Sequence, residues 1–69
     1  MPFLTVRLAK ELIADDPEGK KALLGKRITQ AITETTGVRE DEIWIVFDEV
    51  PARNWYVGPR DVESIKFKT

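Results

Sequence analysis

The side chains that could carry out chemistry in this chain are carboxylates, amines, guanidinium groups and hydroxyls. Cysteine and histidine are both absent, which excludes disulfides, thiolate or imidazole metal ligands, cysteine nucleophiles and Ser-His-Asp catalysis. Two pairs of adjacent acids, Asp15-Asp16 and Asp48-Glu49, could suggest glycosidase or metal chemistry. Helix capping accounts for the first pair and a strand end for the second. We therefore expect no metal site and no cofactor.

The charge balance and the apolar pattern restrict the partners. Lysine and arginine number 11 and aspartate and glutamate 12, for a formal net charge of −1, so no excess of cations can follow a phosphate backbone. The longest apolar run, Ile43 to Phe47, has five residues, too few to cross a membrane. We expect neither nucleic acid nor a membrane as partner. Because no basic segment followed by a long apolar one opens the chain, the expected location is cytoplasmic.

The elements that must position these groups begin with a strand at Phe3–Leu8. Leu4, Val6 and Leu8 fall on one face of it at a period of two. The next segment, Ala9–Asp15, is expected to form a loop.

A helix is predicted from Pro17 to about Thr36. Asp16 supplies the N-cap, Pro17 suits the first helical position, and Gly37 suits the left-handed position that ends a helix. One apolar stripe has the spacing of a buried helix face, and its members are Leu24, Ile28, Ala31, Ile32 and Thr35, widened by Leu23.

The second half predicts a buried strand followed by short extended segments. Ile43–Phe47 is β-branched and aromatic on both faces, as is typical of a strand covered on both sides. A strand, a crossover helix and a second strand form a right-handed unit with parallel strands. The rest of the chain predicts turns at Pro51–Asn54 and Gly58–Pro59, with strands at Trp55–Val57 and Val62–Phe67. Residues 1–69 are therefore expected to form one α+β domain.

A chain of 69 residues is close to the lower limit for a self-sufficient core. Without a disulfide or a metal, such a domain usually gets only a few kcal/mol from its own core, and oligomerisation is a common remedy. A helix stripe together with a strand that is apolar on both faces presents more hydrophobic surface than one subunit can cover. We therefore expect a homo-oligomer whose subunits share a core.

Four features of the chain occur together in one known family. They are the Met1-Pro2 start that runs directly into a strand, the crossover helix, the second strand, and the segment Asn54–Gly58. With them, nearly the whole chain resembles the 4-oxalocrotonate tautomerase group of the tautomerase superfamily. The resemblance implies a β-α-β subunit with parallel strands and a C-terminal β-hairpin. It also implies a hexamer built as a trimer of dimers.

The resemblance implies that Pro2 is the catalytic residue. In that family the amine of an N-terminal proline, exposed when the initiator methionine is removed, serves as general base and then as general acid. Such an amine accepts a proton near neutral pH when desolvation and nearby cations disfavour its ammonium form. On a 2-hydroxy-2,4-dienoate or a similar enol acid it would take the enol proton and return a proton to carbon. A cation would meanwhile hold the carboxylate of the substrate.

Two positions match the walls of the family's pocket. Trp55 matches an aromatic residue that lines the pocket and makes it more hydrophobic, although a tryptophan packed at a subunit interface is an equally good reading. Val57 falls where the family has an apolar wall. The resemblance therefore implies a substrate pocket with an apolar side.

Both arginines that are typical of the family are missing. Trp44 stands where the second strand usually carries the arginine that polarises the substrate carbonyl. The loop after the first strand is a few residues longer than in the family and has no arginine for the carboxylate. Its nearest cation, Lys10, would bind as a point charge without the guanidinium fork, and an exposed surface lysine is the favoured reading of it. Arg7, Arg53 and Arg60 are further cations, one of which a neighbouring subunit could contribute, although solvated surface or interface charge is the favoured reading of them.

Two functional hypotheses follow. The first is an isomerase, a cofactor-free keto-enol tautomerase or a related proline-dependent dehalogenase or decarboxylase, acting on small unsaturated 2-hydroxy or 2-oxo acids. The alternative is a catalytically degenerate tautomerase-fold oligomer that binds a small molecule or serves as a structural unit. The missing arginines keep the alternative open beside the leading isomerase hypothesis. The expected partners are a small-molecule carboxylate substrate and further copies of this chain.

Overall fold

The computed structural model describes residues 2–67. Its strands and helix are β1 (Phe3–Ala9), α1 (Pro17–Thr36), β2 (Trp44–Val50), β3 (Tyr56–Val57) and β4 (Arg60–Asp61). Short helical turns are η1 (Lys10–Ile13), η2 (Glu40–Glu42), η3 (Ala52–Asn54) and η4 (Glu63–Phe67). This order confirms an α+β chain with a C-terminal hairpin. None of the described helices is both long and apolar enough to cross a membrane.

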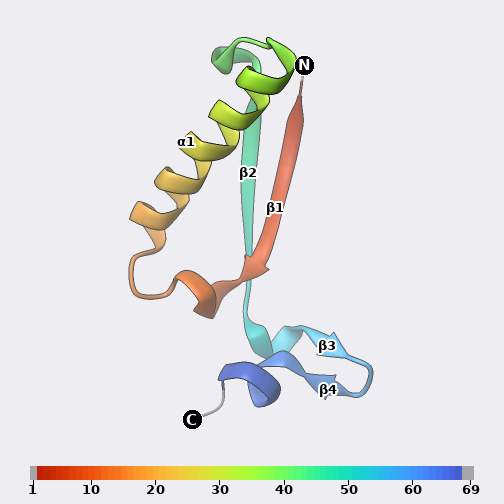
Figure 1. Ribbon diagram of the computed structural model, residues 1–69. Helices are drawn as coiled ribbons and strands as arrows, with labels where there is room; N and C mark the ends of the chain where they lie inside the picture. Colours follow the sequence, from red (N-terminus) through yellow and green to blue (C-terminus); the bar gives the residue numbers. More distant parts are fainter. Residues whose placement is uncertain (1, 68–69) are drawn as a thin grey trace.

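β1 and β2 form a two-stranded parallel sheet, as the βαβ pattern predicts. Their register runs from Phe3 opposite Trp44 to Ala9 opposite Val50. The helix α1 runs back alongside the two strands, and the β3–β4 hairpin lies beyond their C-terminal ends (Figure 1). The sheet therefore has two distinct ends, one at the start of β1 and one near the hairpin.

Local side-chain chemistry sets both ends of α1 where the sequence predicts them. The carboxylate of Asp16 accepts a hydrogen bond from the Gly19 backbone N–H at 3.2 Å, which satisfies one of the free donors of the first turn. Gly37 adopts φ 78°, and its N–H donates to the carbonyl of Thr33. A residue with a Cβ rarely takes that left-handed conformation, so glycine is favoured at this position.

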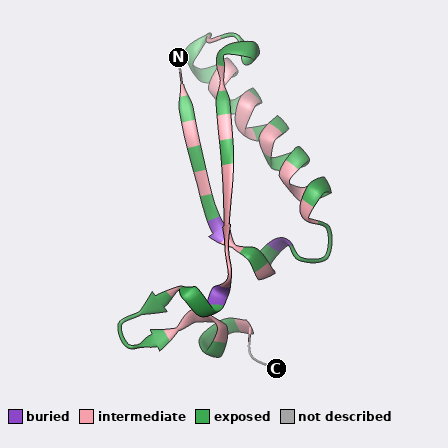
Figure 2. Ribbon diagram, turned by 180° about the vertical axis from the view of Figure 1, so that it is seen from behind, coloured by how far each residue is buried: buried purple, intermediate pink, exposed green. Residues whose placement is uncertain are grey.

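The sheet is covered on one face only within this subunit. Leu4, Val6 and Leu8 face inward as their alternation predicts, and Leu8 is buried. Figure 2 shows exposed and partly covered residues alternating along the two strands of this sheet. The opposite surface, here called the outer sheet face, consists of Phe3, Thr5 and Arg7 of β1 with Trp44, Val46, Asp48 and Val50 of β2. Phe3 is 66% exposed, Trp44 59% and Val46 47%. The cover that the sequence predicts for both faces of β2 is thus missing from one face of the single subunit.

The prediction that the second strand ends at Phe47 is wrong, because β2 continues through Asp48 and Glu49 to Val50. Each acid has a cation on its own side of the sheet. The Arg7 Nε donates to an Asp48 carboxylate oxygen at 2.8 Å, and the Lys21 ammonium donates to Glu49 at 2.8 Å. These ion pairs let two charged residues remain in the strand.

The C-terminal strand predicted at Val62–Phe67 is also wrong. The structure pairs β3 with the two-residue β4 across a turn containing Gly58, and residues 63–67 form the turn η4. The carboxylate of Asp61 accepts hydrogen bonds from the Ser64 backbone N–H at 3.0 Å and from its hydroxyl at 2.9 Å. These bonds fold the backbone into a helical turn in place of an extended strand.

Lys21 links α1 to the end of β2. Its ammonium lies 2.8 Å from Glu49 and 3.3 Å from Glu18, and the Lys21 and Glu49 side chains are both largely covered. The hydrogen bond to Glu49, followed by that to Glu18, raises the pKa of Lys21 above its usual 10.5. This contact fixes one end of the helix against the sheet.

Replacing Lys21 by methionine should lower the melting temperature by several degrees, because it leaves the covered Glu49 carboxylate without its partner. Because the pKa of Lys21 is higher in the folded than in the unfolded chain, its ion pair stabilises the fold fully at pH values below 10.5, the pKa in the unfolded chain. This stabilisation is lost as the pH rises through the pKa of Lys21 in the folded chain. The melting-temperature difference between parent and variant should therefore persist up to about pH 10 and shrink above it. Lys20→Met is the matched control, since Lys20 pairs with the exposed Asp15. A difference that is constant through alkaline pH would contradict this role of Lys21.

Candidate active site

Pro2 lies at the start of the parallel sheet, directly beside Trp44. The Trp44 backbone N–H donates to the Pro2 carbonyl oxygen at 3.1 Å, which continues the hydrogen bonding of the two strands by one residue. Pro2 itself is half-buried, whereas the neighbouring Phe3 and Trp44 side chains are exposed. The strand pairing thus holds Pro2 in place beside an aromatic surface. Met1, whose removal would free the proline amine, lies outside the described residues.

A second group of predicted residues gathers at the other end of the sheet. The Trp55 indole N–H donates to the Val50 carbonyl at 3.2 Å and so fixes the ring at the end of β2. Beside it is a hollow of about 460 Å³ lined by Arg7, Asp48, Val50, Asn54 and Trp55. This hollow combines the ion pair of Arg7 and Asp48 with an aromatic wall.

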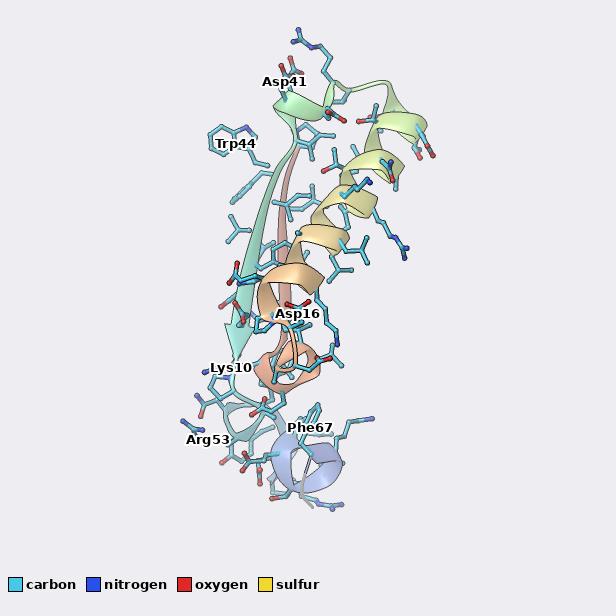
Figure 3. All side chains as sticks on the ribbon, turned by 90° about the vertical axis from the view of Figure 1, so that its left-hand side faces the viewer. Lys10, Asp16, Asp41, Trp44, Arg53 and Phe67 are labelled. Carbon is cyan, nitrogen blue, oxygen red and sulfur yellow. The ribbon has the colours of Figure 1, made fainter. Side chains whose placement is uncertain are left out.

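Lys10 and Val57 lie near this second end but do not line the hollow. Lys10 begins the turn η1 directly after β1, and Figure 3 places it, like Arg53, far along the molecule from Trp44. Val57 is exposed on the hairpin strand β3. Among the residues proposed from the sequence, Trp55 and Arg7 therefore line this hollow in the described structure, whereas Lys10, Val57, Arg53 and Arg60 do not.

The loop that follows β1 has a positioning role that sequence reasoning missed. Its residue Glu11 accepts a hydrogen bond from the Ala52 backbone N–H at 2.9 Å, and Ala52 is fully buried. Ile13 of the same loop is only 3% exposed. The loop thereby anchors η3, which carries the chain into Trp55. A single acid within a loop gives no periodic signal, so this contact is visible only in the fold.

The predicted residues do not form one pocket within a single subunit. Pro2 and Trp44 lie at the start of β1 and β2, whereas Trp55 lies beyond their far ends. A strand of seven residues at about 3.3 Å per residue separates the two groups by roughly 20 Å. Among the described residues no cluster of three or more acidic side chains could hold a metal ion. The chemistry available is that of amines, guanidinium groups and aromatic surfaces.

Comparison with known proteins identifies the family. The profile of the family described as "Tautomerase enzyme" matches residues 2–65. Proteins of Bacillus cereus and Bacillus anthracis, each named "Probable tautomerase", are 31% identical over 58 residues, covering 84% of this chain and 88% of theirs.

Solved structures give the same result for the fold. A 4-oxalocrotonate tautomerase isozyme structure from Methylibium petroleiphilum superposes with a TM-score of 0.74 at 25% identity, covering 94% of this chain and 98% of that one. The structure of DmpI from Helicobacter pylori has a TM-score of 0.74 at 19% identity, covering 99% of this chain and 100% of that one, and supports the fold alone. The chain therefore belongs to the tautomerase family and is a tautomerase-type isomerase of the group similar to 4-oxalocrotonate tautomerase.

Proposed function

We propose that this protein is a cofactor-free keto-enol tautomerase of small unsaturated 2-hydroxy and 2-oxo acids, with the amine of Pro2 as general base and acid after Met1 is removed. The observation that carries the proposal is the placement of Pro2. Its carbonyl is held by the Trp44 N–H at 3.1 Å, at an aromatic end of the sheet. When a second copy covers the exposed Phe3 and Trp44 side chains, this end of the sheet becomes poor in water, which disfavours an ammonium ion and favours a neutral base.

The reaction needs only proton transfers. The neutral amine removes the proton from the enol hydroxyl, and the O–H bonding electrons form the carbonyl. The electrons of the carbon–carbon double bond shift along the conjugated chain to the carbon that takes the proton back from the ammonium group. No group is oxidised or reduced, and the amine ends in its starting state, as general acid–base catalysis requires.

We further propose that the active site is completed by assembly into a homo-oligomer, a hexamer built as a trimer of dimers. Two observations support assembly. Of the described residues, only Leu8, Ile13 and Ala52 are buried hydrophobics, whereas Phe3, Trp44 and Val46 expose apolar surface on one face. The two groups of site residues are also separated by the length of β1, so an antiparallel second copy would bring the Pro2 end of one subunit to the Trp55 end of the other.

Trp44 predicts the substrate preference of such a site. An arginine that stabilises developing negative charge in a water-poor site typically contributes a few kcal/mol to the transition state. With Trp44 in that position, the protein should ketonise the monoacid phenylenolpyruvate faster than the diacid 2-hydroxymuconate. The variant Trp44→Arg should shift the ratio of the two kcat/KM values toward the diacid by at least about tenfold. Ultraviolet absorbance of the enol measures both rates.

The same assay distinguishes the proposal from the alternative of a binding or structural oligomer. Measurable ketonisation by the mature protein supports the tautomerase. If neither acid is turned over although mass spectrometry shows that Met1 is gone, the proposed activity is wrong, and the absence of the usual arginine at Trp44 then favours the degenerate oligomer.

A further inference from the structure

The chain lacks an arginine at the two positions where its relatives are expected to carry one, but the fold brings another arginine to the candidate site. Arg7 lies on the outer sheet face and lines the hollow of about 460 Å³ together with Trp55. Lys10, Arg53 and Arg60 do not line this hollow. Of the four cations considered, Arg7 is therefore the one that lines the same hollow as Trp55.

The setting of Arg7 suits the binding of a carboxylate. Its Nε donates to Asp48 at 2.8 Å in an exposed ion pair, which orients the guanidinium group from one edge. A guanidinium has five N–H donors, so the terminal amino groups can still form the paired hydrogen bonds that a carboxylate accepts. Asn54 lines the same hollow, and an asparagine amide can supply a further donor there. This combination of donors is directional, whereas an ammonium group would bind as a point charge.

The apolar part of the hollow determines which kind of carbon skeleton can accompany the carboxylate of a ligand. Val50 and the Trp55 ring line it beside Arg7, and the indole N–H is already bonded to the Val50 carbonyl. The ring therefore offers its apolar surface to a ligand. A flat conjugated chain or ring suits such a wall better than a branched or strongly polar one.

We propose that Arg7, oriented by Asp48, binds the carboxylate of a small planar unsaturated acid whose apolar body lies against Trp55. This inference rests on the proposed function, because it names the acid-binding residue of that site. An antiparallel second copy would bring its Pro2 end to the hollow, so that the acid group lies at Arg7 and the reacting carbons near the amine. Arg7 thereby takes over the role expected of an arginine in the loop.

The test uses trans-cinnamate, a planar unsaturated acid with no enol to isomerise, and its neutral analogue cinnamamide. Binding is followed by NMR through the Trp55 indole N–H, which is assigned with a Trp55→Phe variant. Cinnamate should shift the Trp55 signal to saturation, and cinnamamide should bind much more weakly. Arg7→Met should raise the Kd for cinnamate by about tenfold to a hundredfold, the usual range for hydrogen bonds to a charged group.

Two matched variants remove a nearby cation that does not line the hollow, namely Arg53→Met and Lys10→Met. Both should leave the Kd for cinnamate within about twofold of the parent. If Lys10→Met weakens binding and Arg7→Met does not, the assignment to Arg7 is overturned. If Arg7→Met does not assemble, Arg7→Lys replaces it, with a several-fold weaker Kd expected, and an unchanged Kd in that variant also overturns the inference.

The enol assay separates this inference from the proposed function. A parent protein that binds cinnamate through Arg7 but does not ketonise enol acids would refute the activity and leave the binding site standing. A parent that ketonises enol acids, with Kd and KM unaffected by Arg7→Met, would refute the role of Arg7 alone.

Discussion

Replacing Pro2 by alanine should lower kcat/KM for phenylenolpyruvate by about a hundredfold or more, the usual contribution of general acid–base catalysis. Alanine keeps an N-terminal amine once Met1 is removed, but it loses the ring that fixes the direction of the nitrogen. The backbone hydrogen bond from Trp44 to the carbonyl of residue 2 can persist in the variant. The fold and the assembly should therefore be unchanged, and the loss should fall mainly on kcat.

A form of the protein that keeps Met1 provides the control. In that form the proline nitrogen is part of an amide and has no basic lone pair, so it should be as inactive as the alanine variant or less active. Intact mass spectrometry defines each form, and light scattering confirms equal assembly. If the Pro2→Ala variant assembles normally and matches the parent in kcat/KM, the proline amine is not the base.

Replacing Val46 by aspartate should convert the oligomer to a monomer of about 7.9 kDa at micromolar concentration. Val46 lies in the middle of the outer sheet face and is 47% exposed in the single subunit. An aspartate there would have to be buried without a partner when a second copy covers the face, at a cost of several kcal/mol. Because the site is proposed to be shared between subunits, ketonisation should be lost together with assembly.

Ala22→Asp is the matched control for this variant. Ala22 is exposed on α1, outside the apolar stripe of the helix and away from the outer sheet face, and its replacement introduces the same charge. This variant should keep the mass of the parent assembly in light scattering. A parent protein that is itself monomeric at micromolar concentration would rule out assembly, and equal dissociation by both variants would show that the outer sheet face is not the specific contact.

Much of the fold follows from the amino-acid sequence because its signals are local. Asp16 and Gly37 set the ends of α1 through bonds and backbone conformations within a few residues, and the alternation in β1 selects its inner face. The signals fail where distant partners decide. Asp48 and Glu49 look like the end of a strand, yet Arg7 and Lys21 keep them inside β2. After β4, the short polar segment has no strong period, so the hydrogen bonds of Asp61 decide its course.

The sequence by itself determined which chemistry is available: no thiol and no imidazole, a proline at position 2, and no arginine at the two positions where the resemblance to the 4-oxalocrotonate tautomerase group implies one. Tertiary structure decided where these groups lie. The register of the parallel strands sets Arg7 opposite Asp48, and the turn η3, anchored by Glu11, brings Trp55 to the same hollow. The tertiary structure also places Pro2 at the opposite end of β1 from this hollow. Such juxtapositions depend on pairing between residues far apart in the chain, and residue spacing along one segment carries no information about them.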